Sequence, residues 1–240
     1  CEKLETYSIV APSDLQSRID SIAAEKAKQT TGDTTYIDIA TAIVGAEDNS
    51  AAWWTAFSDY FTIPVNKLLH LEFVNHGTGV NNWNNWNLAV TNEVADRDGD
   101  GYKEYFVLRS DAYGWGGTMA NEGYAYDGGM ISFDYPDTDG DGDIWNDFRT
   151  TMQGANVTLE VDHSSTGNVF VTATAVGTNG VELVMTYQQA VSAANNIVAF
   201  LICDGSYFEM KKAYLIPSKV TVVEDVNPVS IAVEGTPEFV

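Results

Sequence analysis

Aromatic and amide side chains gather in two short stretches of this chain. Trp83 and Trp86 stand among five asparagines in residues 81–87, and Tyr113 and Trp115 follow farther on, with Trp115 between two glycines. A sugar ring presents C–H groups to an aromatic face and hydroxyl groups to amides or carboxylates. These residue types therefore favour the binding of a carbohydrate. Trp86 is the exception, because it leads directly into an apolar strand and is expected in the core.

A predicted β-hairpin positions these side chains. Two runs of strand composition, 86–91 and 102–109, flank a turn rich in Asp and Gly, which is the signal for a hairpin with a longer loop. Antiparallel pairing would carry Trp83 and Trp115 to the same end of the sheet, opposite the turn. An isolated indole on a polar loop exposes apolar area unless a ligand covers it. The predicted ligand-binding residues are Trp83, Trp115, Tyr113, Trp53, Trp54, Asn82, Asn85 and Asp111.

Two acidic loops have the spacing of the first half of a calcium loop. Both match D-x-D-x-D-G, in which the glycine lets the side chains at positions one, three and five converge on a hard cation. Neither has a glutamate at position twelve, where Val107 and Phe148 stand, so these loops are not EF-hands. A further ligand would come from Glu104 or Asp147. The alternative is that Asp and Gly simply form good turns. The predicted structural Ca²⁺ site comprises Asp137, Asp139, Asp141, Asp143 and Asp147, and the weaker candidate comprises Asp96, Asp98 and Asp100.

One predicted strand carries a pair of alternating acids. Glu160 and Asp162 resemble the beginning of the E-x-D-x-x-E strand of family 16 glycoside hydrolases, but Ser164 and Ser165 stand where the third acid should be. Retaining hydrolysis needs two carboxyl groups about 5 Å apart in separate roles. The pair alone does not supply that arrangement.

Other residue types with catalytic potential lack the required context. His70, His76 and His163 do not have the spacing of metal ligands. Cys203 lies in the apolar run IVAFLIC, which favours a packed thiol over a reactive thiolate or a disulfide partner. The sequence thus indicates a binding protein rather than an enzyme, and a glycosidase whose acids meet only in space stays open as an alternative.

The charge of the chain narrows the possible ligands. Twelve Lys and Arg residues stand against 34 Asp and Glu residues, for a formal net charge of −22. Such a field repels nucleic acid, anionic membrane surfaces and highly charged polysaccharides. Neutral polysaccharides or oligosaccharides and divalent cations remain suitable partners.

Strand signals fill most of the chain from residue 35 onward. In the second half, five strand-like runs are separated by short turns, which is typical of an antiparallel sandwich or barrel. We expect an all-β fold, an antiparallel β-sandwich of the jelly-roll, concanavalin-like type. Residues 1–34 read as a tether with a short amphipathic helix, 35–217 as the sandwich, and 218–240 as a linker and the start of an immunoglobulin-like repeat.

Four segments and the first residue together carry a family resemblance. The segments are FTIPVNKLLHLEFVN, NWNNWNLAVTNE, GYKEYFVLRSDAYGWG and VAFLICDGSYFEM. With Cys1, they resemble the concanavalin-like (laminin-G or jelly-roll) domains of surface glycan-binding lipoproteins from bacterial polysaccharide-utilisation systems. The resemblance implies lipidation at Cys1 and a cell-surface, outer-membrane location, with surface enzymes or a transporter as partners. Members include binding modules and hydrolases, and the incomplete set of acids favours the former.

The sequence therefore predicts a non-catalytic surface lipoprotein that binds a neutral polysaccharide on an aromatic platform. The main alternative is an adhesin or structural stalk module that contacts proteins. A glycan array separates the two, because an adhesin would bind protein or itself and leave glycans unbound.

Overall fold

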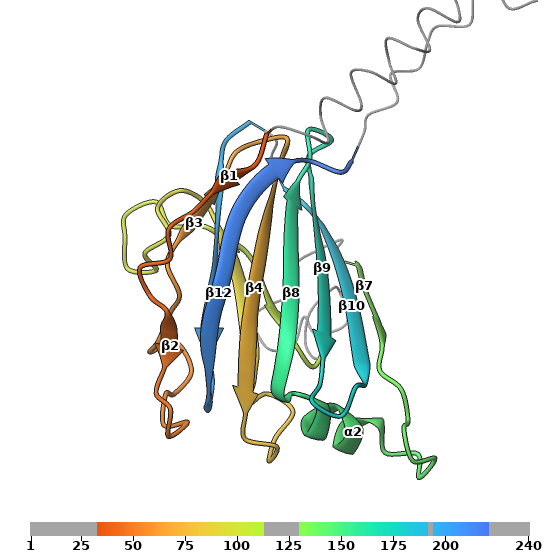
Figure 1. Ribbon diagram of the computed structural model, residues 1–240. Coiled ribbons are helices and arrows are strands. Elements are labelled where there is room, and N and C mark those ends of the chain that lie inside the picture. The colour runs from red at the N-terminus through yellow and green to blue at the C-terminus, as the bar shows by residue number, and fades with distance from the viewer. Residues whose placement is uncertain (1–32, 113–129, 192–193, 221–240) are drawn as a thin grey trace, which may run out of the picture.

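Two antiparallel sheets form the protein, as the sequence predicts for an all-β sandwich (Figure 1). The computed structural model describes residues 33–112, 130–191 and 194–220. No helix in this part of the chain has the length and apolarity of a membrane-spanning segment. The elements are β1 (Thr35–Tyr36), β2 (Ile43–Gly45), β3 (Phe61–Ile63), β4 (Lys67–Gly77), β5 (Trp86–Thr91), β6 (Glu104–Arg109), β7 (Met130–Asp134), α2 (Ile144–Thr151), β8 (Gln153–His163), β9 (Asn168–Val176), β10 (Glu182–Ala190), β11 (Ile197–Cys203) and β12 (Ser206–Pro217).

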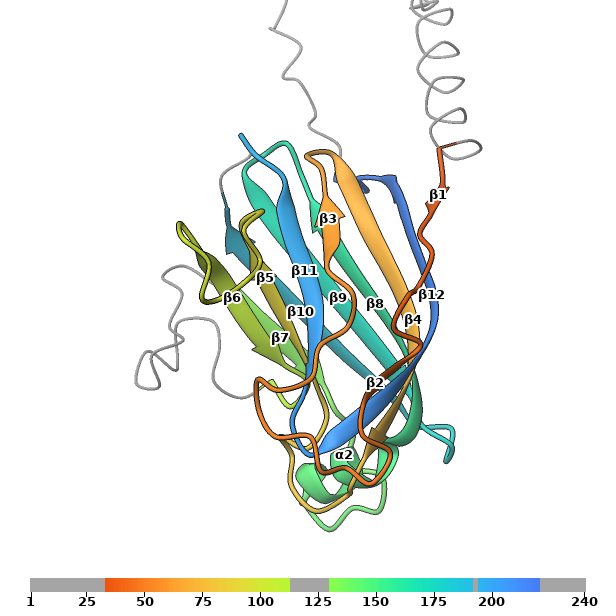
Figure 2. The same cartoon turned by 90° about the vertical axis from the view of Figure 1, so that its left-hand side faces the viewer.

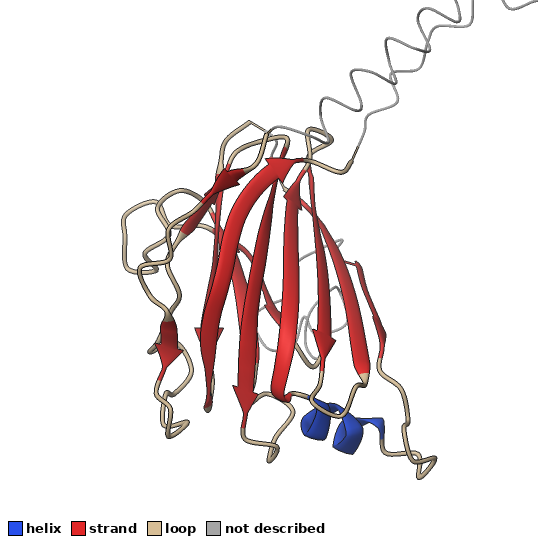
Figure 3. Cartoon of the chain, viewed as in Figure 1, coloured by secondary structure: helices blue, strands red, loops and turns tan. Residues whose placement is uncertain are grey.

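The larger sheet has the strand order β1-β12-β4-β8-β9-β10-β7, with β2 also paired to β12, and the smaller sheet has the order β3-β11-β5-β6. Figure 2 shows the smaller sheet in front of the larger one. Strands dominate the described chain, and α2 lies at one end of the sandwich (Figure 3). Neighbouring strands in the larger sheet run antiparallel throughout.

Side-chain alternation places the core between the sheets. On β9, Val169, Val171, Ala173 and Ala175 are buried, while the residues between them are more exposed. Every residue of β5 and β11 is buried, because loop aromatics also cover the outer face of the smaller sheet. These are Trp54, Phe57 and Tyr60, whose rings contact Phe200 on β11. Burial on both faces explains why these two strands have nearly continuous apolar sequences.

The predicted hairpin is confirmed as β5 and β6, paired from Asn87 with Arg109 to Thr91 with Glu104. The short helix α2 follows the second acidic loop. β1 and β2 are separate short strands, because the Asp59 carboxylate accepts the backbone N–H groups of Ala40 and Thr41 between them. Those groups are therefore not available to hydrogen-bond with a neighbouring strand.

The chain remains bonded to the larger sheet past the predicted domain boundary at Pro217. The Lys219 N–H donates to Asp162 Oδ2 at 2.8 Å, and the Ser218 N–H donates to the Asn66 carbonyl at 2.8 Å. The predicted tether helix, the lipid anchor at Cys1 and the immunoglobulin-like tail lie outside the described residues. They stay predictions.

Candidate functional site

Trp83 lies on a turn at the α2 end of the sandwich, directly before β5. The Asn84 N–H donates to the Asn81 carbonyl at 3.2 Å, and the Asn85 N–H donates to the Trp83 carbonyl at 2.8 Å. These bonds turn the chain so that Trp83 is 46% exposed, whereas Trp86 is 2% exposed in the core. The predicted contrast between the two indoles is confirmed. The exposed ring is available to a ligand.

Arg109, at the end of β6, lies over the Trp83 indole. Its Cζ is 6.0 Å from the ring centroid. Its Nε and Nη2 donate to the two carboxylate oxygens of Asp111 at 3.1 and 2.5 Å. This bidentate pair of hydrogen bonds fixes both the position and the orientation of the guanidinium. We call Trp83, Arg109, Asp111 and Asn82 the Trp83 platform.

Two side chains predicted to meet a ligand are instead buried and used internally. Asp111 is 1% exposed and holds Arg109. Asn85 is 2% exposed; its Oδ1 accepts from Asn75 Nδ2 at 2.9 Å, and its Nδ2 donates to the Asn82 carbonyl at 2.9 Å. Asn75 Oδ1 in turn accepts the Trp86 N–H at 3.0 Å. Buried amides of this kind fasten the turn to the sheet, since they complete their hydrogen bonds within the protein.

Asn82 is partly exposed beside Trp83. Its Oδ1 accepts from Arg149 Nη1 at 2.9 Å, and Arg149 Nη2 lies 3.8 Å from Asp143 Oδ2. Arg149 thus connects the Trp83 platform to α2 and to the second acidic loop. The amide group of Asn82 has further hydrogen-bonding capacity beyond this one bond.

Trp53 and Trp54 lie on the loop that covers the smaller sheet. Their rings are 5.5 Å apart, both are partly buried, and Trp54 has a φ of 61°. A tryptophan in the left-handed region is uncommon and costs about 1 kcal/mol or more. The Arg97 guanidinium lies 4.5 Å from the Trp54 ring centroid. Tyr113 and Trp115, the other predicted aromatics, lie outside the described residues.

Three cations of one hairpin all lie on aromatic rings. Between Lys67 and Arg149 the only Lys and Arg residues of the sequence are Arg97, Lys103 and Arg109. Each lies over a ring at the smaller sheet, namely Trp54, Tyr105 and Trp83 respectively. Cation–π contacts hold rings in place and occupy one ring face. This side of the sandwich therefore presents ordered aromatic rings in an otherwise acidic protein.

Sequence reasoning missed one acid at this site, Asp204. It lies in the turn between β11 and β12, and Asn84 Nδ2 donates to its backbone carbonyl at 3.0 Å. Burial raises the pKa of Asp204, while Arg109 and the Trp53 N–H act in the opposite direction. About 120 residues separate Asp204 from the asparagine-rich stretch, so local patterns gave no signal for it.

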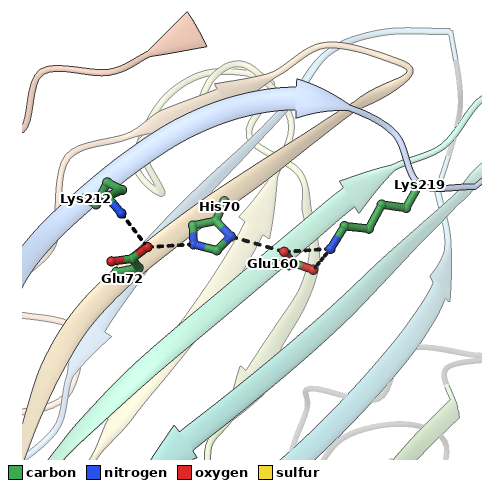
Figure 4. A network of polar contacts seen from close by, with 5 residues as sticks. All are labelled: His70, Glu72, Glu160, Lys212 and Lys219. Carbon is green, nitrogen blue, oxygen red and sulfur yellow. Dashed lines mark hydrogen bonds and ion pairs between the residues drawn. The ribbon is translucent and has the colours of Figure 1, made fainter. Parts of the chain in front are cut away.

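A second polar cluster lies on the outer face of the larger sheet (Figure 4). His70 Nδ1 is 3.1 Å from Glu160 Oε1, and His70 Nε2 is 3.2 Å from Glu72 Oε1. Lys219 Nζ donates to both oxygens of Glu160, and Lys212 Nζ donates to Glu72. The hydrogen bond to His70, followed by the lysine contact, lowers the pKa of Glu160 to about 2. Lys212 and His70 likewise lower the pKa of Glu72.

These carboxyl groups do not have the protonation expected of a glycosidase. General acid catalysis requires one carboxyl group with a raised pKa beside an ionised one. Glu160 and Glu72 are both held ionised by cations, and Asp162 is buried beneath the Lys219 backbone. The face nevertheless has a shallow depression of about 280 Å³ farther along, lined by Met130, Phe170, Thr172, Thr186 and others.

The other residues with catalytic potential, His163, Cys203 and His76, make contacts typical of a structural role. His163 and Cys203 are buried, and burial raises the pKa of the Cys203 thiol to about 12. Cys203 Sγ donates to the Val44 carbonyl at 3.3 Å. His76 stacks on Tyr207 and contacts Glu209. The prediction of a packed thiol at Cys203 is confirmed.

The second acidic loop has the better geometry for a cation. Ligand oxygens of Asp137, Asp139 and Asp141 lie within 4.8 Å of one another, all exposed. Asp143 instead caps α2 by accepting the Trp145 and Asn146 N–H groups. Both oxygens of Asp147 accept from Thr138. Carboxylates are the ligands that Ca²⁺ prefers, so Asp137, Asp139 and Asp141 are the residues that fit it.

The first acidic loop joins β5 to β6, at the opposite end of that hairpin from Trp83. Asp96 Oδ1 accepts the Asp98 N–H at 3.0 Å, which is a turn-forming bond. Asp96, Asp98 and Asp100 are not among the metal-type clusters found in the described residues.

No family model matches this chain, and comparison with curated proteins and with solved structures found no significant match.

Proposed function

We propose that this protein is a non-catalytic carbohydrate-binding domain that holds a neutral polysaccharide at the Trp83 platform. The observation that carries the proposal is the exposed indole of Trp83, fixed by an arginine that is itself fixed by Asp111. An ordered ring loses little conformational entropy when a ligand covers it. Its free face suits the C–H groups of a pyranose.

The surroundings of Trp83 support a sugar over other apolar ligands. Asn82, the neighbour of Trp83 in the chain, and the guanidinium of Arg109 provide an amide and a cationic group at this ring. Hydroxyl groups can donate to or accept from groups of these types. The net charge of −22 disfavours polyanionic glycans, so a neutral chain fits best.

The ionised state of Glu72 and Glu160 supports the non-catalytic part of the proposal. Each carboxylate already neutralises a lysine and contacts His70. A proton donor for a leaving sugar oxygen is therefore not supplied by this pair. Incubation of the bound polysaccharide with the protein should release no reducing sugar.

Affinity electrophoresis in gels that contain neutral polysaccharides tests the proposal. We expect wild-type migration to be retarded and Trp83→Ala to migrate freely. Phe170→Ala is the matched control, because it removes a partly exposed ring from the depression on the other sheet. Retardation lost in Phe170→Ala and kept in Trp83→Ala would place binding on the larger sheet and contradict the proposal. Association with proteins in place of glycans would favour an adhesin.

A further inference from the structure

A second half-exposed ring, that of Tyr60, lies on the smaller sheet. Tyr60 is 50% exposed, which is close to the 46% of Trp83. Its ring centroid is 4.8 Å from that of Phe200 on β11, which is fully buried. β3 begins at the next residue, Phe61, and pairs with β11. Tyr60 is therefore held by a buried ring and by a strand, while about half of its own side chain is open to solvent.

Arg109 projects from the outer face of the smaller sheet. On the same strand, β6, Phe106 packs against Tyr187 of the larger sheet at a ring distance of 4.8 Å, so it points into the core. Successive side chains of a strand point to opposite faces. Val107 and Arg109 therefore both point away from the core, and the Trp83 ring beside Arg109 lies on this outer side.

The strand register places Phe200 on this outer face as well. Phe200 is paired with Ala89 on β5, and Ala89 is paired with Val107 on β6. Directly paired residues lie on the same face of a sheet. The Tyr60 ring, which contacts Phe200, is therefore on the same face of the smaller sheet as the Trp83 ring.

The loop of residues 51–58 runs along β11 between the two exposed rings. At the α2 end of the sandwich, the Gly205 N–H donates to the Ala51 carbonyl at 2.7 Å. Toward β3, the Ser58 N–H donates to the Leu201 carbonyl at 3.0 Å. The loop carries two partly buried indoles, whose ring centroids are 5.5 Å apart. Its aromatic side chains are therefore positioned between the two exposed rings.

Strand geometry sets the separation of the two exposed rings. Tyr60 directly precedes β3 and Arg109 is on β6, and β11 and β5 lie between these strands. Neighbouring strands are about 4.8 Å apart, so β3 and β6 are about 14 Å apart. The rings of Tyr60 and Trp83 are therefore on the order of 15 Å apart across the sheet. A disaccharide is too short to contact both rings, whereas a hexasaccharide is long enough.

We propose that one oligosaccharide chain contacts both Trp83 and Tyr60, with different sugar residues stacked on the two rings. Each ring is half exposed and is held by a neighbouring side chain, so each suits the apolar face of a pyranose. Once one ring is occupied, the second contact is intramolecular, which raises the affinity for a chain that reaches both. The site then selects oligosaccharides long enough to cross the smaller sheet. This inference rests on the proposed function and deepens it to a class of ligand, a chain of several sugar residues.

Titration calorimetry with a disaccharide and a hexasaccharide of one linkage tests the inference, with cellobiose and cellohexaose or maltose and maltohexaose as the pair. We expect the wild-type protein to bind the hexasaccharide at least about tenfold more tightly than the disaccharide. Tyr60→Ala should weaken hexasaccharide binding by about tenfold and change disaccharide binding by less than about twofold.

Two further variants serve as controls for Tyr60→Ala. Tyr60→Phe keeps the ring and should bind both ligands as the wild type does. Tyr36→Ala removes a 73% exposed ring from the larger sheet and should also leave binding unchanged. Thermal unfolding of Tyr60→Ala should stay close to that of the wild type, because the side chain is half exposed.

The outcomes separate this inference from the proposed function. Hexasaccharide binding that is lost in Trp83→Ala and unchanged in Tyr60→Ala overturns the second contact and leaves the proposed function standing. Equal losses for the disaccharide and the hexasaccharide in Tyr60→Ala assign Tyr60 to the support of the Trp83 site and also overturn the inference. Absence of wild-type binding to these ligands and to an array of neutral 1,4-, 1,6- and 1,3-linked glycans overturns both.

Discussion

The guanidinium of Arg109 lies 6.0 Å from the Trp83 ring centroid, and both of its bonded nitrogens point to Asp111. Arg109 and Asp111 are two residues apart, at the end of β6 and just beyond it. Arg109, held by Asp111, keeps the exposed indole of Trp83 in one position. Contacts thus run from the buried carboxylate of Asp111 through the guanidinium of Arg109 to the half-exposed ring of Trp83.

Substitution of Asp111 should therefore lower the free energy of unfolding by more than the loss of so small a side chain would by itself. Asp111→Ala removes the carboxylate to which Arg109, whose side chain is 18% exposed, donates two hydrogen bonds, and breaking a buried ion pair costs about 3 kcal/mol. Urea denaturation measures this loss. Glu209→Gln is the control, since its contacts with Lys211 and His76 are more exposed, and it should change the free energy of unfolding much less. Equal losses for both variants would show that Asp111 does not anchor the platform.

Substitution of Trp86 should affect mainly stability, whereas substitution of Trp83 should affect mainly ligand binding. Trp86→Ala removes a core ring and should lower the free energy of unfolding by about 3–5 kcal/mol. Trp83→Ala should lower it by about 1 kcal/mol or less, because the ring is half exposed. Chemical denaturation of both variants checks this difference. A Trp83→Ala protein as unstable as Trp86→Ala would assign Trp83 to the fold.

Acid should weaken the protein through Glu160. Its pKa is lowered from 4.5 to about 2 in the folded state by His70 and Lys219. A carboxyl group with a lowered folded-state pKa stabilises the protein above its unfolded pKa and loses that contribution as the pH falls through the folded value. Stability should thus decline between about pH 4.5 and pH 2.

Glu160→Gln should make the loss of stability between pH 4.5 and pH 2, the acid limb of the stability curve, less steep. At pH 7 it should lower the free energy of unfolding by about 1 kcal/mol. Glu182→Gln, at an exposed position at the start of β10, removes the same charge as a control and should leave the limb unchanged. Thermal unfolding followed by circular dichroism from pH 7 to pH 2 gives both curves. An unchanged acid limb in Glu160→Gln would assign the decline to other groups.

Calcium should bind the second acidic loop in preference to the first. Addition of Ca²⁺ at 100 times its dissociation constant would stabilise the folded state by about 2.7 kcal/mol. Asp139→Asn should weaken this effect, since Asp139 contributes to the cluster of exposed oxygens. Asp98→Asn, in the loop between β5 and β6, should not. A thermal shift that is absent from the wild type, or lost equally in both variants, contradicts the assignment.

Much of the fold could be predicted because its signals are local. The alternation of Val169, Val171, Ala173 and Ala175 indicates one buried face, and β9 has it. The Asp and Gly turn predicts the β5–β6 hairpin. Trp86 precedes an apolar strand, and this neighbourhood identifies it as a core residue.

The site was less predictable because its contacts are distant or depend on burial. The sequence around Asn85 suggests an exposed amide, yet its side chain is buried and accepts a hydrogen bond from Asn75 on β4. Asp111 looks like a loop acid, and its burial follows from the bond to Arg109. The backbone of Asp204 lies beside Asn84 only because β11 pairs with β5, which brings the turn after β11 to the loop before β5. No spacing rule connects residues so far apart in the chain.

The proposed function requires a neutral glycan to cover the Trp83 ring. The most direct test is a titration with cellohexaose followed by the tryptophan indole N–H signals in an ¹H–¹⁵N spectrum, with Trp83→Phe and Trp86→Phe used to assign the two signals. We expect a large, saturable shift of the Trp83 signal and a stationary Trp86 signal. A stationary Trp83 signal under conditions in which the glycan binds would contradict it.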